Sequence, residues 1–167
     1  CMREAALHND YLGINYYQRA VVAYEKGAAP THSRRIIPPG QPVTAGGWEV
    51  YPPGLGTILT RVHEDYAPAA LYVMENGAAF HDQVIDGKVN DPERESFIHQ
   101  HLLQVHEVIE AGVPVRGYFV WSLLDNFEWN RGYSLRFGIV YVDFETQERI
   151  IKRSGYWYAD ASRENGI

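Results

Sequence analysis

Three apolar segments, each ending in polar or aromatic residues, constrain the fold of this chain most strongly. They are residues 11–17 (YLGINYY), 71–77 (LYVMENG) and 115–121 (VRGYFVW). Near-continuous apolar strands separated by helices are typical of a parallel sheet covered on both faces. The polar residues stand at the carboxyl end of each strand, where parallel α/β folds build their binding sites. The sequence therefore predicts an α/β fold with a site at that end of the sheet.

The segments between and after these strands carry helix and turn signals. Apolar residues recur at helical spacing in one of them, at Leu55, Ile58, Leu59, Val62 and Tyr66. A second helix is expected to begin at Asp91, as N-cap, and to end at Gly112. A hairpin is expected within residues 138–151, followed by a helix that Ser154 caps. Residues 27–47 are rich in Gly, Pro, Ala and Thr without either period, and they predict a long loop.

Glu75 stands at the end of the second apolar strand, directly before an Asn-Gly pair. An acid in that place costs free energy to desolvate unless it is paired, hydrogen-bonded or used. One interpretation is a turn acid that forms a salt bridge with a neighbour, because Asn-Gly favours turns. The other is a carboxylate that works in a binding or catalytic site.

Composition narrows the class of function. A net charge of −6 and a pI of about 5.6 argue against nucleic acid or an anionic membrane surface as the main partner. No apolar run approaches the roughly 20 residues of a membrane span, and Cys1 alone excludes an internal disulfide, so we expect a cytoplasmic protein. The 12 Tyr, 6 Phe and 4 Trp residues exceed the needs of the core, and they favour a surface that contacts sugars or aromatic ligands.

Several motifs together resemble the C-terminal part of the family-one glycoside hydrolases, the β-glucosidases. They are residues 11–17, Gly47-Trp48-Glu49, residues 72–77, residues 117–129 (GYFVWSLLDNFEW) and Arg136-Phe137-Gly138. Their order and spacing are kept from about residue 10 to about residue 160, and the W-S-L-L-D-N-F-E-W run is highly specific. The resemblance implies a TIM (β/α)8 barrel. Residues 1–167 would form a single segment with about the last three βα units, and the N-terminal part of the barrel would be missing from this chain.

The resemblance also implies a reaction, the retaining hydrolysis of β-linked glucosides and related oligosaccharides. Glu75 would be the catalytic nucleophile, and Tyr17 would donate a hydrogen bond that holds it in line. Asn15 would neighbour the catalytic pair. The substrate-binding set implied in this way is Asn15, Trp48, Trp121, Glu128, Trp129 and Phe137.

Each of the other binding residues would have a distinct role by resemblance. Glu128 would accept hydrogen bonds from sugar hydroxyls far from the reacting carbon, and Trp129 would donate its indole N–H nearby. Trp121 would be the floor on which the sugar stacks. Phe137 would line the same pocket, and Trp48 would flank the leaving group.

Taken singly, these residues also fit simpler interpretations. Trp121 and Trp129 fit core aromatics, residues 125–128 fit a solvated turn with a capping role, and Asn15 fits the end of a strand. The order and spacing of the motifs favour the sugar-binding interpretation over these alternatives.

Two departures from the family pattern change what this chain can do. The residue before Glu75 is usually Thr in the family and is Met74 here. The family's acid/base glutamate lies in an N-E-P motif, which is absent from this sequence. We therefore expect negligible hydrolysis of unactivated glucosides by this chain alone.

A three-stranded parallel piece would also leave two raw edges and an uncovered barrel interior. We expect a partner that covers them, either the N-terminal barrel segment as a second chain or another copy of this chain. The alternative function is a non-catalytic sugar-binding or self-assembling barrel fragment. No cofactor is expected, because two carboxylates suffice for the reaction. No metal site is expected, because His99, His101 and His106 share a helix without a spacing of three or four residues.

Overall fold

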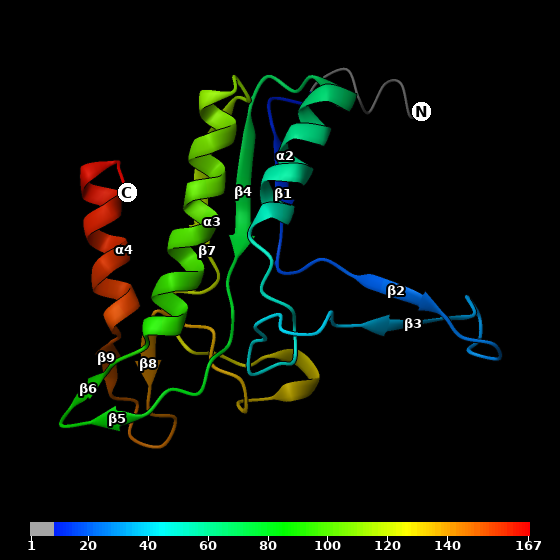
Figure 1. The fold of residues 1–167 in the computed structure, drawn as a ribbon. Helices are drawn as coiled ribbons and strands as arrows, with labels where there is room; N and C mark the ends of the chain where they lie inside the picture. Colours follow the sequence, from blue (N-terminus) through cyan, green and yellow to red (C-terminus); the bar gives the residue numbers. More distant parts are fainter. Residues whose placement is uncertain (1–8) are drawn as a thin grey trace.

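The computed structural model describes residues 9–167, so Cys1 lies outside the described residues. A three-stranded parallel sheet runs in the order β1–β4–β7, with β4 in the centre (Figure 1). Its strands are β1 (Leu12–Asn15), β4 (Leu71–Asn76) and β7 (Val115–Val120). The predicted α/β fold with parallel strands is confirmed.

Helices cover one face of this sheet. Helix α2 (Pro53–Tyr66) and helix α3 (Pro92–Glu110) lie against the strands, and α4 (Arg153–Glu164) lies beside α3 (Figure 1). The core between the helices and the sheet includes Leu55, Leu59, Leu71, Val73, Val105, Val108 and Val115. The helical spacings in the sequence thus predicted α2 and α3 correctly, and α4 is the helix expected after the hairpin. No helix among residues 9–167 is both long and apolar enough to cross a membrane.

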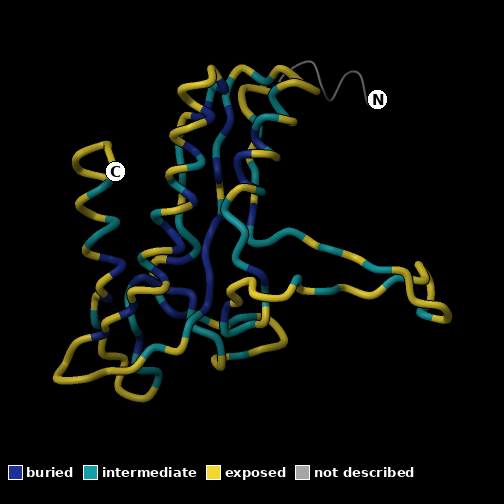
Figure 2. Tube along the Cα trace, in the orientation of Figure 1, coloured by how far each residue is buried: buried dark blue, intermediate teal, exposed yellow. Residues whose placement is uncertain are grey.

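The opposite face of the sheet is open in the described part of the chain, so the expected cover on both faces is not found there. Met74 of β4 and Phe119 of β7 are 41% and 51% exposed. Side chains alternate along a strand, so Leu71 and Val73 point toward the helices while Met74 points away from them. Figure 2 shows the buried residues concentrated along the sheet and the adjoining helices.

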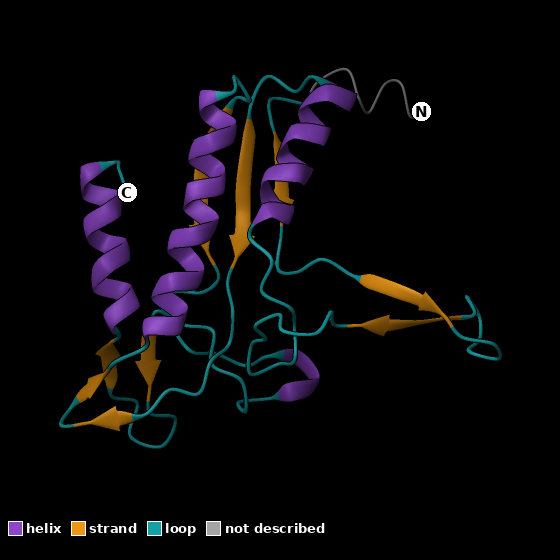
Figure 3. Cartoon of the chain, in the orientation of Figure 1, coloured by secondary structure: helices purple, strands orange, loops and turns teal. Residues whose placement is uncertain are grey.

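A hairpin extends from the body between β1 and α2 (Figures 1 and 3). It consists of β2 (Val21–Tyr24) and β3 (Ser33–Ile36), which pair antiparallel. The predicted loop at residues 27–47 is therefore wrong for β3. The strand was missed because its Ser-Arg-Arg-Ile sequence has no alternation of apolar and polar residues.

Two smaller hairpins lie near the carboxyl end of the sheet. One pairs β5 (Val84–Ile85) with β6 (Lys88–Val89), and the other pairs β8 (Val140–Val142) with β9 (Arg149–Ile151). The second is the predicted hairpin. A short 3-10 helix, η1 (Trp129–Arg131), lies in the segment before it.

The predicted helix caps are wrong in their chemistry although the helices are present. Asp91 occupies the N-cap position of α3 but makes no capping hydrogen bond. Its carboxylate instead accepts the backbone N–H of Ser154 at 2.9 Å and its hydroxyl at 2.6 Å. Ser154 therefore does not cap α4; Lys152 is the residue at that N-cap. Gly112, with φ of 94°, does adopt the predicted left-handed conformation.

Candidate active site

Glu75 lies near the carboxyl end of β4, the central strand, so both neighbouring strands contribute to its surroundings. Asn15 of β1 is its partner in the strand register. The backbone N–H of Tyr16 donates to the Glu75 carbonyl at 2.9 Å, which continues the pairing beyond β1. The carboxylate is half-buried. The backbone around Glu75 is thus fixed by hydrogen bonds within this chain.

Tyr17 is the hydrogen-bond partner of the Glu75 side chain. Its hydroxyl donates to Glu75 Oε2 at 2.7 Å. Burial, together with this hydrogen bond and the charge of Glu75, raises the pKa of the Tyr17 phenol, which therefore stays protonated as a donor at neutral pH. Within residues 9–167, Glu75 forms no ion pair, so the interpretation as a salt-bridged turn acid does not hold there.

The rings of Trp48 and Phe137, which come from separate loops, gather around the Tyr17 ring. The Tyr17 and Trp48 ring centroids are 5.8 Å apart, and those of Tyr17 and Phe137 are 6.4 Å apart. Trp48 and Phe137 also contact each other, at 5.8 Å. Aromatic pairs at these distances and tilted angles are favourable. They form an apolar wall next to a carboxylate.

Glu128 shares the site with Glu75. Burial and the negative charge of Glu75 raise the pKa of the Glu128 carboxyl, and a hydrogen bond with Trp121 opposes that rise. The structure thus brings Glu128 and Trp121 together with the Glu75 pair. Trp129 is 81% exposed, so it is not a core residue of the described chain.

The sequence pattern that defines Glycosyl hydrolase family 1 matches residues 2–167. The chain belongs to this family. Family 1 relatives are similar in sequence over almost the whole chain. A 1,4-beta-D-glucan glucohydrolase from Thermotoga neapolitana is 49% identical over 167 residues, which cover 99% of this chain and 37% of the relative.

Solved family 1 structures are also similar to this chain. A family 1 b-glucosidase from Thermotoga maritima is 47% identical with a TM-score of 0.93, over 99% of this chain and 37% of that protein. A second structure, the Thermotoga maritima beta-glucosidase in complex with glucoimidazole, has a TM-score of 0.92, with the same identity and coverage. The chain therefore spans little more than a third of the length of these relatives.

Asn76 has a role in this family 1 chain that the sequence analysis missed. It is fully buried within β4, where its side chain donates to the Tyr16 carbonyl at 2.6 Å and accepts from the Tyr118 hydroxyl at 2.5 Å. It therefore joins all three strands next to Glu75. The turn interpretation of Asn-Gly is wrong here. Gly77 is required for close approach, since a Cβ there would lie 1.8 Å from the Trp121 carbonyl oxygen.

A partly buried ion pair joins the segments that carry Tyr17 and Trp48. The Arg19 guanidinium donates to both Glu49 oxygens, at 2.9 and 2.8 Å, and lies 3.6 Å from the centre of the Tyr51 ring. Glu49 is 3% exposed, and the hydrogen bonds from Arg19 lower the pKa of its carboxyl. Arg19 and Glu49 follow Tyr17 and Trp48 closely in sequence. The sequence analysis missed this ion pair, although two opposite charges close to predicted site aromatics could have indicated it.

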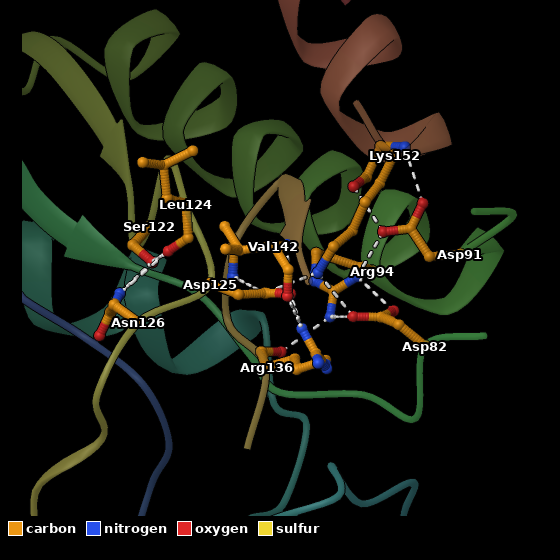
Figure 4. A network of polar contacts seen from close by, with 12 residues as sticks. Asp82, Asp91, Arg94, Ser122, Leu124, Asp125, Asn126, Arg136, Val142 and Lys152 are labelled. Atoms are coloured by element: carbon orange, nitrogen blue, oxygen red, sulfur yellow. Dashed lines mark hydrogen bonds and ion pairs between the residues drawn. The ribbon is translucent and has the colours of Figure 1, made fainter. Parts of the chain in front are cut away.

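The structure also contains a network of buried charged side chains (Figure 4). It includes Asp125, which the turn interpretation placed in solvent but which is only 4% exposed. Lys152 and Arg136 both donate to it, at 2.8 and 2.6 Å. No group of three or more His, Cys, Asp or Glu residues within the described chain could hold a metal ion.

Proposed function

We propose that this chain supplies the nucleophile of a retaining β-glucosidase that hydrolyses β-linked glucosides and oligosaccharides. The observation that carries the proposal is the 2.7 Å hydrogen bond from Tyr17 to Glu75 at the carboxyl end of the central strand. In a retaining mechanism one carboxylate attacks the sugar and forms a covalent glycosyl-enzyme, which water then hydrolyses. Glu75 is the carboxylate that would attack.

The surroundings of Glu75 suit a nucleophile. The phenol of Tyr17 occupies one carboxylate oxygen and leaves the other to attack the anomeric carbon. Because its pKa is raised, Tyr17 remains a neutral donor and does not compete for the proton. Glu75 is half-buried, which limits the water around it without the full cost of desolvating a charge.

The other site residues would bind the sugar. Trp121 and Phe137 would supply apolar faces for its C–H surface, and Glu128 would accept hydrogen bonds from its hydroxyls. Trp48 would contact the leaving group, and Asn15 would lie beside the reacting carbon because it is paired with Glu75 in register. Trp129 would join the pocket once a further segment covers its exposed ring.

The acid/base carboxyl would come from the N-terminal barrel segment. This chain spans 37% of the length of its relative from Thermotoga neapolitana, lacks the N-E-P motif and leaves one face of its sheet open. We define the assembled barrel as this chain together with that N-terminal segment, on the same or a second chain. In it, this chain would supply the last three βα units, and the open face would become the barrel interior.

A trapping experiment on the assembled barrel tests this function. An activated 2-deoxy-2-fluoro-β-glucoside reacts with a retaining glycosidase but leaves slowly, so the sugar should remain attached to the peptide that contains Glu75 and be found there by mass spectrometry. The Glu75→Gln variant should lose both labelling and turnover while it still binds glucoimidazole. Glu107→Gln, at an exposed position on α3, serves as the matched control and should react like the unmodified protein.

Two outcomes would contradict the proposal. Labelling on a different carboxylate would remove Glu75 from the nucleophile role. Turnover that survives in Glu75→Gln would instead favour the alternative, in which this chain only binds sugar.

A further inference from the structure

Six charged side chains form one connected network of ion pairs (Figure 4). They are Asp82, Asp91, Arg94, Asp125, Arg136 and Lys152. The side chains are at most 2% exposed, except Arg136, at 20%. Three are acids and three are bases, so their formal charges cancel. We call them the charged cluster.

The charged cluster is costly to bury. Replacing buried ion pairs by apolar side chains is often neutral or stabilising, so stability alone is a weak reason to keep six charges inside a small protein. Removing one partner is strongly destabilising, because the other charge is left without compensation. A cluster of this kind fixes the backbone segments that carry its side chains in one arrangement.

Two members connect the cluster to the segment that carries Phe137: Arg94 donates to the Arg136 carbonyl at 2.9 Å, and Asp125 makes more contacts with it. Asp125 Oδ1 accepts the backbone N–H of Gly138 at 2.9 Å and the ammonium of Lys152 at 2.8 Å. Its Oδ2 accepts the guanidinium of Arg136 at 2.6 Å and faces the N–H of Val142 at 3.4 Å. One carboxylate thus holds two points of the backbone and two cations.

The backbone held in this way carries Phe137, one residue before Gly138. The Ser122 N–H donates to the Phe137 carbonyl at 3.2 Å, and the Ile139 N–H donates to the Ser122 carbonyl at 2.9 Å. Trp121 is therefore fixed through the same pairing. A Cβ on Gly138 would lie 2.2 Å from the Asp125 backbone nitrogen, so the two segments are already in closest contact.

We propose that Asp125 is a positioning residue for the sugar-binding side of the pocket. Its carboxylate, held by Lys152 and Arg136, fixes the backbone that presents Trp121 and Phe137. Glu75 lies on β4 and Tyr17 lies just beyond β1, and a hydrogen bond joins them, so Asp125 acts on sugar binding rather than on the nucleophile. The inference rests on the proposed function, because only a sugar substrate makes these two rings a binding surface.

The test is the Asp125→Asn variant of the assembled barrel, assayed with an aryl β-glucoside well below its unfolding temperature. The amide has the shape of the carboxylate but turns an NH2 group toward donors that need an acceptor. We expect kcat/KM to fall at least tenfold, mainly through a higher KM, with the pH profile unchanged because Glu75 and Tyr17 are untouched. Val108→Ala, a destabilising change in the core between α2 and α3, is the control and should keep the unmodified KM and kcat.

A second readout follows the backbone directly. Amide hydrogen exchange in Asp125→Asn should rise within residues 121–126 and 136–142 and stay unchanged at residues 12–17. Where Asp125→Asn does not fold, Arg136→Gln provides the same test, because it removes one of the two cations at a partly exposed position.

The outcomes separate this inference from the proposed function. A kcat/KM within twofold of the unmodified value overturns the inference, and so does a loss confined to kcat. If the unmodified assembled barrel does not hydrolyse glucosides, the proposed function fails. In that case hydrogen exchange alone tests the role of Asp125. A rise within residues 121–126 and 136–142 shows that Asp125 fixes these segments, and unchanged exchange refutes it.

Discussion

His101 should make folding stability depend on pH in a window that the structure defines. The imidazole is fully buried on α3, where Nδ1 lies 2.7 Å from the Phe97 carbonyl oxygen and the two ring centroids are 4.0 Å apart. A carbonyl oxygen only accepts, so Nδ1 carries the proton. Nε2 is buried without a partner among the described residues. Burial lowers the pKa of His101 from 6.5 to about 4, because the charged ring cannot be solvated there.

Proton linkage gives the sign and the size of the change in unfolding free energy with pH. The folded pKa lies below the unfolded one, so between these values the unfolded chain binds more protons and stability falls as pH falls. The contribution of the neutral His101 ring to the free energy of unfolding is fully present above pH 6.5 and is lost as pH drops toward 4. The whole shift corresponds to about 3 kcal/mol, of which about 1.4 kcal/mol is lost between roughly pH 7.5 and 5.5.

Urea unfolding of the assembled barrel at these two pH values measures the effect. His101→Gln keeps an amide donor for the Phe97 carbonyl but cannot gain a charge. Its unfolding free energy should fall by about 1.4 kcal/mol less than that of the unmodified protein over the same interval. His106→Gln, at an exposed position on the same helix, should follow the unmodified protein. Parallel loss of stability in His101→Gln and the unmodified protein would refute the reasoning.

Two further predictions concern Gly77, which follows β4, and Tyr17, the hydrogen-bond partner of the proposed nucleophile Glu75. Gly77→Ala should lower the free energy of unfolding by about 3 kcal/mol, because the new Cβ would lie 1.8 Å from a backbone oxygen of Trp121 that cannot move aside. Gly46→Ala meets no atom closer than 3.5 Å and should cost much less; equal losses in urea titrations would contradict this account. Tyr17→Phe should lower kcat/KM on an aryl glucoside about 10- to 100-fold without unfolding, because Glu75 loses a hydrogen bond of the kind that contributes about 1.5–3 kcal/mol. A change below twofold in folded protein would remove Tyr17 from the mechanism.

The elements that the sequence predicted well are those with a strong local pattern. The three strands of the sheet read as apolar runs, and α3 places Phe97 and His101 on one buried face, as its spacing indicates. β3 was missed because two arginines in four residues give no strand pattern. Its pairing with β2 decides its structure, and that pairing lies outside any short window of sequence.

The charged groups show the same limit more clearly. Asp125 looks like a turn residue in its own segment, yet its partner Lys152 lies 27 residues away. Asp91 looks like a helix cap, yet its hydrogen bonds go to Ser154, 63 residues away. A capping pattern reports what a carboxylate can do locally. It does not report a stronger partner that the fold brings from elsewhere.

The central position of β4 has a consequence for the order in which an active site of this kind forms. Both strands that flank Glu75 belong to this chain, and so does Tyr17, which orients it. The contacts that position Glu75, the proposed nucleophile, thus lie within this chain. Closure of the barrel by the N-terminal segment would bring the proton donor to the site and cover the exposed Trp129 ring. Imperfect closure would therefore weaken leaving-group departure and sugar affinity first, and the reach of the nucleophile last.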